Sequence, residues 1–291
     1  MKKILLLINP KSRKGSDSFD EAAQILQEQG YFLLNSKKNL EQHSMHELII
    51  QHRDNIDVVA IGGGDGSVNT ALSALVETQI PMVLIPLGTA NNMARTLNIP
   101  IDIKQSLDIL NTGEIHKIDL GIVNKIYFVN VAGLGLSTEI NRKVPSDLKK
   151  QLGVFAFVWT ALQLSYKMRP FRTYITCDGK TVQRRSWQIT VCNGKYYGSG
   201  LTIAESASLT DGRLDCLSTE MRKWWQGFFL IPRIIKGNYQ STEELSLFQG
   251  QNITIKTRRP KKIDVDGDIQ TYTPAVFSVS PKALAVYIPK N

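Results

Sequence analysis

A glycine-rich loop is the strongest chemical signal in this chain. The segment GGGDGS (62–67) directly follows the apolar run DVVAI (57–61) and directly precedes a segment with helical spacing. Glycines let the backbone turn sharply and approach a ligand closely, because they have no Cβ atom. The start of a helix adds free N–H donors and a partial positive charge. We therefore expect this loop to bind an anion such as a phosphate chain, since a plain strand-to-helix turn needs fewer glycines.

Two further loops follow apolar runs in the same way. The segment NPKSRKG (9–15) follows the run 3–8, and PLGTANN (86–92) follows the run 81–85. In an open α/β sheet, ligands bind beyond the carboxyl ends of the strands. The first loop offers the cations Lys11, Arg13 and Lys14, and the last offers a hydroxyl and two amides. The three loops are predicted to converge on one phosphate site.

The better-known phosphate fingerprints do not account for this site. G-x-G-x-x-G fails in the glycine-rich loop because Ser67 stands where the third glycine is needed. The P-loop GxxxxGK[ST] and the H-R-D catalytic loop of protein kinases are absent from the sequence. The chain is expected to bind nucleotide in a different way.

Strands that alternate with helices must position these loops. This order is typical of a doubly wound α/β domain with a parallel sheet. The expected strands are Lys3–Ile8, Tyr31–Leu34, Asp57–Ile61 and Pro81–Ile85. The expected helices are Asp20–Gln29, Ser44–His52, Val68–Thr78 with Ser67 as its N-cap, Asn91–Leu97 and Ile103–Asn111.

The pattern changes after about residue 119. Short runs of β-branched and aromatic residues, separated by turns such as Asp178-Gly179 and Asp266-Gly267, favour an antiparallel sandwich or barrel. Apolar helical stretches interrupt the runs near Leu152–Met168 and Trp224–Ile235. We expect an α/β domain over 1–122, to which residues 281–291 can return, and a β-sandwich-like domain over 123–280. The runs are Ile126–Val131, Tyr174–Thr176, Ser186–Val191, Leu214–Leu217, Asn252–Lys256, Lys262–Val265 and Val276–Ser280.

The motifs, in their order and spacing, resemble the diacylglycerol kinase catalytic family, in particular the bacterial soluble lipid kinases. The resemblance rests on GGGDGS, PLGTANN, the early NP loop and a late DGD (266–268), and it covers nearly the whole chain. The segments FVNVAGLG (128–135), CNG (192–194) and SLTDGRLD (208–215) are similar to later blocks of the family. GGxDG[ST] alone would be shared with NAD kinases.

This resemblance implies a two-domain enzyme that transfers the γ-phosphoryl group of ATP to a lipid hydroxyl, with magnesium. It places Asp268 at the position of the catalytic base and Asp65 at a second catalytic position. It places Ser208, Asp211 and Arg213 at a structural magnesium site, where the first and last contribute backbone carbonyls. The implied nucleotide and metal contacts are Asn9, Lys14, Gly63, Gly64, Asp65, Gly66, Ser67, Gly88, Thr89, Asn92 and Asp119.

Three positions depart from the family pattern. Ser67 replaces a threonine and keeps the hydroxyl, Asn92 replaces an aspartate, and Asp268 replaces a glutamate. A general base must come within about 2.6–3.2 Å of its proton, and the shorter side chain of Asp268 holds its carboxylate back. Two alternatives to an active lipid kinase therefore stay open: a nucleotide- or lipid-binding regulator with weakened catalysis, and an NAD kinase-like enzyme. The latter would need an Asn-Glu pair after the glycine-rich loop, but in this chain Val68-Asn69-Thr70 is followed by no such pair.

Composition points to an anionic partner and a cytoplasmic location. The chain carries 35 Lys+Arg and 26 Asp+Glu, a formal net charge of +9. The segment Met221–Tyr239 combines aromatic and basic residues, as a membrane headgroup interface does, although it also suits a core helix. We expect peripheral association with anionic membrane, with Leu152–Met168 as a second contact, and no nucleic acid binding. Three scattered cysteines favour a reducing cytosol, and a homodimer stays open.

Overall fold

The computed structural model describes residues 1–10, 15–34, 43–143, 169–197, 201–202, 208–221, 223, 226 and 244–290. The chain divides into two compact units, one made of Met1–Asp119 with Pro281–Asn291 and the other of Leu120–Ser280. Strands β5 (Glu114–Val123) and β18 (Ala275–Ile288) each contribute residues to both units.

A parallel sheet forms the centre of the first unit. Its strands lie in the order β2-β1-β3-β4-β18. Strands β1, β3 and β4 are buried almost throughout, which explains why the sequence shows them as continuous apolar runs. At the sheet's far side Val286 of β18 pairs with Met82 of β4. The bounds are β1 Lys3–Ile8, β2 Phe32–Leu33, β3 Val58–Gly63 and β4 Met82–Pro86.

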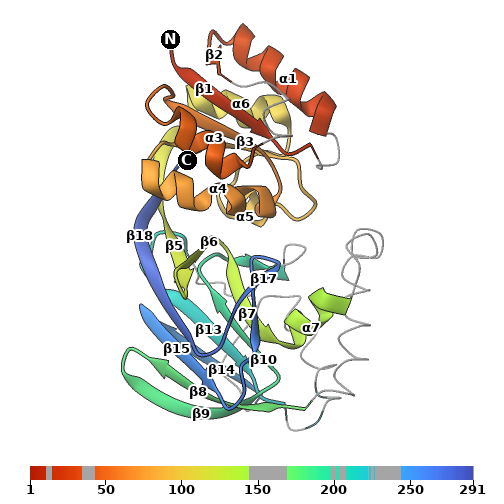
Figure 1. Cartoon of the computed structure of the whole chain (residues 1–291), viewed down its shortest axis with the longest axis vertical. Helices are drawn as coiled ribbons and strands as arrows, with labels where there is room; N and C mark the ends of the chain where they lie inside the picture. Colours follow the sequence, from red (N-terminus) through yellow and green to blue (C-terminus); the bar gives the residue numbers. More distant parts are fainter. Residues whose placement is uncertain are drawn as a thin grey trace. The chain divides into compact units, whose positions relative to one another are not determined.

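Helices cover both faces of this sheet (Figure 1). The helix α1 (Gly15–Glu28) packs beside α6 (Ile103–Thr112), and α3 (Met45–His52) packs beside α4 (Asp65–Thr78). Along the strand order, the connection from β1 to β2 runs in one direction, and the connections from β2 to β3 and from β3 to β4 run in the other. Because such connections are right-handed, the helix pair α1 and α6 lies on one face of the sheet and the pair α3 and α4 lies on the opposite face. The short helix α5 (Asn92–Thr96) follows β4. This is the doubly wound α/β arrangement predicted from the sequence.

The start of α4 differs from the prediction. The helix begins at Asp65 with Gly64 as its N-cap, so Ser67 lies inside the first turn and is not the cap. The helix starts earlier because the Gly64 carbonyl already accepts the N–H groups of Ser67 and Val68 at 2.9 and 3.3 Å. The Ser67 hydroxyl instead accepts a hydrogen bond from Asn9 Nδ2 at 3.0 Å. By contrast Ser44 does cap α3, and it forms a capping box with Glu47.

Two antiparallel layers make up the second unit (Figure 1). One layer has the order β14-β13-β10-β7-β16-β17, and the other contains β18, β15, β8 and β9 in that order. The β-sandwich predicted for the second half is therefore confirmed. The remaining elements of this unit are β6, which pairs with β5, the helix α7 and the pair β11-β12. The bounds are β6 Ile126–Phe128, β7 Val131–Gly135, α7 Leu136–Lys143, β8 Phe171–Cys177, β9 Lys180–Ser186, β10 Gln188–Cys192, β11 Tyr196–Tyr197, β12 Leu201–Thr202, β13 Leu214–Thr219, β14 Leu245–Gly250, β15 Asn252–Thr257, β16 Lys262–Val265 and β17 Asp268–Tyr272.

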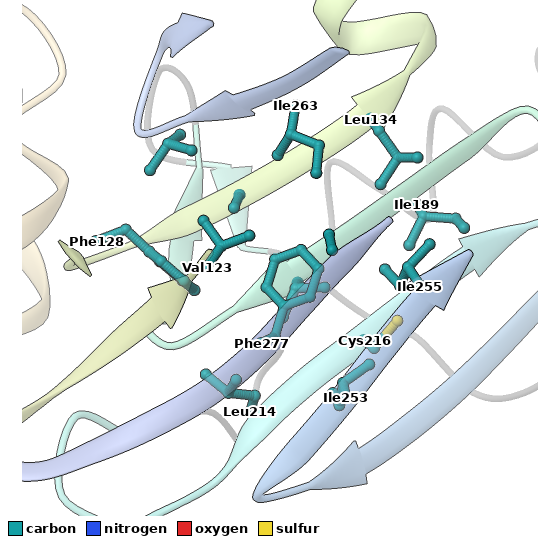
Figure 2. Packing of buried hydrophobic residues seen from close by; sticks show 14 of the residues in the cluster. Val123, Phe128, Leu134, Ile189, Leu214, Cys216, Ile253, Ile255, Ile263 and Phe277 are labelled. Atoms are coloured by element: carbon teal, nitrogen blue, oxygen red, sulfur yellow. The ribbon is translucent and has the colours of Figure 1, made fainter. Parts of the chain in front are cut away.

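Apolar side chains from both layers form the core of this unit. Figure 2 shows Leu134 and Ile189 from one layer facing Ile255 and Phe277 from the other, and all four are fully buried. Alternating side chains along each strand supply this core, because successive residues point to opposite faces of a sheet. The core explains why the β-rich half folds as a sandwich.

Strands β9, β14 and β17 were not predicted. Their sequences KTVQRRS, LSLFQG and DIQTY are polar or mixed, because these strands lie at the ends of the strand order or turn one face to solvent. The predicted run Ile126–Val131 is broken at residues 129–130, where the backbone N–H groups bind the Asp266 carboxylate. The predicted turns at Asp178-Gly179 and Asp266-Gly267 are confirmed, with positive φ at all four residues.

Several predicted features lie outside the described residues. These are the cations Lys11, Arg13 and Lys14, the stretch Leu152–Met168, and all but three residues of Met221–Tyr239. Within the part of the chain that the structure describes, no helix is both long and apolar enough to cross a membrane.

Candidate phosphate-binding site

The first unit brings the loops after β1, β3 and β4 together at one edge of the sheet. The Asn9 N–H donates to the Gly62 carbonyl at 2.9 Å, and the Leu87 N–H donates to the Gly63 carbonyl at 3.0 Å. Since β1, β3 and β4 are parallel neighbours, their carboxyl ends meet at this edge. The structure therefore joins Asn9, the glycine-rich loop and the start of PLGTANN.

Glycine is required where the loops after β3 and β4 cross. A Cβ atom on Gly88 would lie 2.5 Å from the Gly64 Cα and 2.6 Å from Asn91 Oδ1. A Cβ atom on Gly63 would lie 2.2 Å from the Ser67 Oγ. By contrast a Cβ atom on Gly66 would meet nothing within 4 Å. The glycines at 63 and 88 thus permit a backbone packing that no larger residue fits, and a Cβ atom on Gly64 would make a tight contact of 3.1 Å with the Gly88 Cα.

The N-terminus of α4 opens onto this crossing. Its N-cap Gly64 has extended backbone and provides no side-chain cap for the first N–H groups of the helix. Gly66 in the first turn is exposed. Uncapped N–H groups and the positive end of the helix dipole together favour an anion. Thr89, in the crossing loop, is also exposed and could present its hydroxyl to such an anion.

The Asp65 carboxylate ties the two loops to each other. Its Oδ2 accepts the Asn92 N–H and its Oδ1 accepts the Met93 N–H, both at 3.0 Å. The carboxylate therefore caps α5, and its charge suits the positive end of that helix. Before any ligand binds, Asp65 already has a positioning role.

Three asparagines surround this contact. Asn91, at φ 50°, clamps Gly88 by accepting its N–H at 2.9 Å and donating to its carbonyl at 3.0 Å. Asn92 is buried, and its Oδ1 has no hydrogen-bond partner among the described residues. Both amide atoms of Asn69 are also buried and unpartnered there. Asn69 lies one helical turn after Asp65, on the same face of α4. Sequence reasoning included Asn91 only as one of the two amides of the PLGTANN loop. It did not place Asn69 in the site, although the i, i+4 spacing from Asp65 could have indicated it.

Asp119 is placed by a different contact. It is buried on β5, and its Oδ1 accepts the backbone N–H of Lys282 at 2.8 Å. Lys282 lies within β18 and has a φ of 51°, so this bond holds an irregular backbone position where β18 enters the first unit. The role of Asp119 that the structure displays is thus to hold this strand.

In the second unit, the DGD turn is anchored by Asp266 and leaves Asp268 exposed. Asp266 accepts the N–H groups of Val129, Asn130 and Val131 at 2.8, 3.1 and 2.8 Å. The same segment receives Asn193, whose Nδ2 donates to the Val129 carbonyl at 2.9 Å. Three of the blocks that looked familiar in the sequence, FVN, CNG and DGD, are therefore in contact within this unit. Asp268 itself begins β17 and is exposed.

The candidate structural metal residues form a tight turn before β13. The Arg213 N–H donates to Asp211 Oδ1 at 3.0 Å, and Gly212 between them has a φ of 66°. Ser208 is engaged with Thr210, whose N–H lies 3.3 Å from the Ser208 Oγ. Burial and the neighbouring Asp211 raise the pKa of Asp215 to about 6, against the hydrogen bond from Gln249. In the described ranges no three His, Cys, Asp or Glu side chains form a metal cluster, so a metal here would need backbone carbonyls as well.

The first-unit site fits a phosphate chain with an associated cation. The uncapped N-terminus of α4 offers N–H donors, and the open space around Gly66 leaves the backbone of its first turn accessible to a ligand. The buried, unpartnered amide oxygens of Asn69 and Asn92 are acceptors of the kind that Mg²⁺ or its water ligands bind. An unsatisfied buried polar atom costs stability, so these atoms indicate a ligand or water.

Known proteins share both halves of this arrangement. The family model described as the diacylglycerol kinase catalytic domain matches residues 3–123, and the YegS C-terminal NAD kinase beta sandwich-like domain matches residues 130–288. A Bacillus subtilis protein named diacylglycerol kinase is 27% identical, over 100% of this chain and 98% of its own. An uncharacterized Synechocystis protein is 30% identical over 79% of this chain, and the chain spans about half of that protein, 54%.

A solved structure supports the same grouping at the level of the fold. The crystal structure of a putative diacylglycerol kinase from Bacillus anthracis superposes with a TM-score of 0.81 at 23% identity, covering 99% of this chain and 97% of that one. Each half of the chain thus matches a distinct domain of one family, in the same order. The chain belongs to the diacylglycerol kinase catalytic-domain family, in the form whose second domain is the YegS-type β-sandwich.

Proposed function

We propose that this protein is a lipid kinase that transfers the γ-phosphoryl group of ATP to the hydroxyl of diacylglycerol or a related lipid, with Mg²⁺. One observation carries the proposal: the loops after β3 and β4 cross at Gly64 and Gly88, beside the uncapped N-terminus of α4. In this proposal the first unit binds the nucleotide and the second binds the lipid.

The residues of the first unit act by binding and positioning. When bound, ATP supplies the phosphoryl group and Mg²⁺ neutralises charge on the phosphate oxygens. The α4 N–H groups at Asp65 and Gly66, together with the hydroxyls of Ser67 and Thr89, would hold the phosphates. Asn9 keeps the Ser67 hydroxyl in place through its hydrogen bond. Lys14 would add positive charge, and Asn69 and Asn92 would contribute oxygen ligands to the cation or its water.

Asp268 is the proposed general base. A lipid hydroxyl loses its proton late in phosphoryl transfer, so a carboxylate that accepts this proton in the transition state is sufficient. Asp268 is exposed, while Asp264 and Asp266 of the same hairpin hold backbone N–H groups. Exposure of Asp268 therefore supports its assignment, rather than that of Asp264 or Asp266, as the base in this proposal.

The nearest alternative activity is phosphorylation of NAD. That activity would need an Asn-Glu pair after the glycine-rich loop, and no such pair follows Val68-Asn69-Thr70 in this sequence. A regulator without activity remains the other alternative, because Asn92 and Asp268 stand where the family pattern has Asp and Glu. We further propose a cytoplasmic protein that associates with membranes at the surface only.

One experiment separates these functions. Purified protein is incubated with labelled ATP and Mg²⁺, and diacylglycerol, phosphatidylglycerol, a sphingoid base and NAD are offered in parallel. Label in a lipid product supports the proposal. Label in NADP, or ATP binding without transfer to any acceptor, overturns it.

A further inference from the structure

The layer of the second unit that ends at β9 has an outer face rich in positive charge. Strands β15, β8 and β9 are antiparallel neighbours, and their inward residues, such as Ile175 and Ile255, pack in the core. The alternate positions therefore point outward. Among these outward residues, Arg172 of β8 stands opposite Arg185 of β9. Two residues further along β8, Tyr174 stands between Lys256 of β15 and Gln183 of β9.

No acidic residue stands on the three strands that form this face. Arg172, Arg185 and Lys256 are exposed, and so is Arg258, which continues the outward alternation just beyond β15. The sequences of the three strands contain no Asp or Glu. Among the described residues, none of these four side chains has an ion-pair or hydrogen-bond partner. We call Arg172, Arg185, Lys256 and Arg258 the basic face.

The inward arginine of the same hairpin shows the contrast. Arg184 lies between Gln183 and Arg185 on β9, and its Nε is 3.2 Å from the Glu220 carboxylate. It also stacks 5.9 Å from the Phe248 ring centroid. The inward cation Arg184 is therefore paired with a carboxylate and packed on an aromatic ring of the same unit. The four cations of the basic face have no such partner in the part of the chain that the structure describes.

Protection of a sheet edge does not explain the basic face. Charged residues on an edge strand discourage aggregation, and β9 is the last strand of its layer. However, Arg172 and Lys256 lie on β8 and β15, which have neighbours on both sides. Arg172 also stands directly opposite Arg185, a like-charge pair that weakens the sheet. An anionic partner would relieve that repulsion.

Apolar and aromatic groups lie among these charges. The side chain of Tyr174, at the centre of the basic face, is 40% exposed. Val276 of β18, which pairs with Thr254 of β15, is 56% exposed. A tyrosine with one apolar and one polar end suits the headgroup level of a bilayer, and basic residues beside it attract anionic lipids. We propose that the basic face docks the protein on a bilayer of anionic phospholipids. This inference rests on the proposed function, because a lipid kinase must reach its substrate in a membrane.

The test compares vesicle binding of matched charge variants. The double variant Arg172→Gln/Arg185→Gln removes two charges from the basic face. The control Lys3→Gln/Lys290→Gln removes two exposed charges from the first unit. Sedimentation is measured with phosphatidylcholine vesicles, with and without phosphatidylglycerol, at low and high salt. The parent protein and the control should bind the anionic vesicles. The double variant should bind about 25-fold more weakly, since each basic residue near such a surface contributes about fivefold.

The outcomes separate docking from catalysis. Equal binding by the double variant and the parent, equal loss in the control, or binding that ignores phosphatidylglycerol and salt would each overturn the inference. Tight binding of an RNA oligonucleotide by the basic face, with no vesicle binding, would also overturn it. Turnover of a short-chain diacylglycerol dispersed in detergent should be unchanged in the double variant. If no variant phosphorylates any lipid but the vesicle result holds, then only the proposed function fails.

Discussion

The Asp65 carboxylate accepts the backbone N–H of Asn92 at 3.0 Å, which links the glycine-rich loop to the loop after the next strand. The other oxygen of the same carboxylate accepts the N–H of Met93, also at 3.0 Å. One side chain therefore positions two of the three loops that converge at the edge of the sheet. The candidate site is assembled by protein contacts before a nucleotide arrives.

Variants at Asp65 should separate this positioning role from chemistry. Asp65→Ala leaves two helix N–H groups without their acceptor, and we expect a loss of about 1–3 kcal/mol in the free energy of unfolding. Asp65→Asn keeps one acceptor, so it should lose about half as much while still abolishing phosphoryl transfer. Urea denaturation and the transfer assay measure the two effects. Equal stability of the alanine variant and the parent would contradict the positioning role.

The crossing of the two loops should tolerate no side chain at Gly88. In Gly88→Ala the new Cβ atom meets the Gly64 backbone and Asn91, so we expect a loss of about 1–3 kcal/mol and of nucleotide binding. Gly66→Ala is the matched control, because its Cβ atom meets nothing within 4 Å. Its stability should stay equal or rise by up to about 1 kcal/mol, since alanine favours helix. Thermal unfolding and titration with an ATP analogue are the measurements. A Gly88→Ala protein as stable as Gly66→Ala would show that the crossing is looser than described.

Substitutions of Asp266 and Asp268, the two carboxylates of the DGD turn, should have different effects on stability and on catalysis. Asp266→Ala removes the acceptor for three backbone N–H groups and should cost at least about 2 kcal/mol of stability. Asp268→Asn changes an exposed side chain and should stay within about 0.5 kcal/mol of the parent. Its rate of phosphoryl transfer should nevertheless fall about 10²–10⁴-fold, as expected for loss of a general base. Near-normal turnover of Asp268→Asn would exclude it as the base.

Stability should fall as the pH rises through the titration of Asp215. Burial raises the pKa of this carboxyl to about 6, above its unfolded value of about 4. The folded state then holds the proton more tightly than the unfolded state. This contribution to stability is present below about pH 4 and is lost as the pH rises through about 6.

Asp215→Asn removes this titration and should be more stable than the parent at neutral pH. The difference should shrink towards pH 4, and it is measured by urea denaturation across this range with a chelator present. A variant that is less stable than the parent at neutral pH would show that the charged carboxylate is well accommodated. Asp102→Asn, at the exposed N-cap of α6, serves as the control for removing one carboxylate.

Local patterns in the sequence were enough for part of this fold. Lys3–Ile8 forms the predicted strand, because a strand buried on both faces needs apolar residues at every position. Ser44 with Glu47 is a local capping signal, because the two residues lie three positions apart. The Asp-Gly pairs at 178 and 266 were recognisable as turns because these residue types tolerate positive φ. The glycine-rich loop was recognisable because glycines just before a helix have few other uses.

What tertiary structure alone decided depends on contacts between distant residues. Ser67 lies inside the first turn of α4, and its hydroxyl binds Asn9, which is far away in sequence. Asp65 caps α5 only because two strands end side by side. Strand β9 is too polar to be predicted, and it exists because β8 offers a register in which Val182 faces the core and Arg185 faces solvent. Which residues far apart in sequence come into contact depends on the packing of the whole unit, and a local sequence pattern does not hold that information.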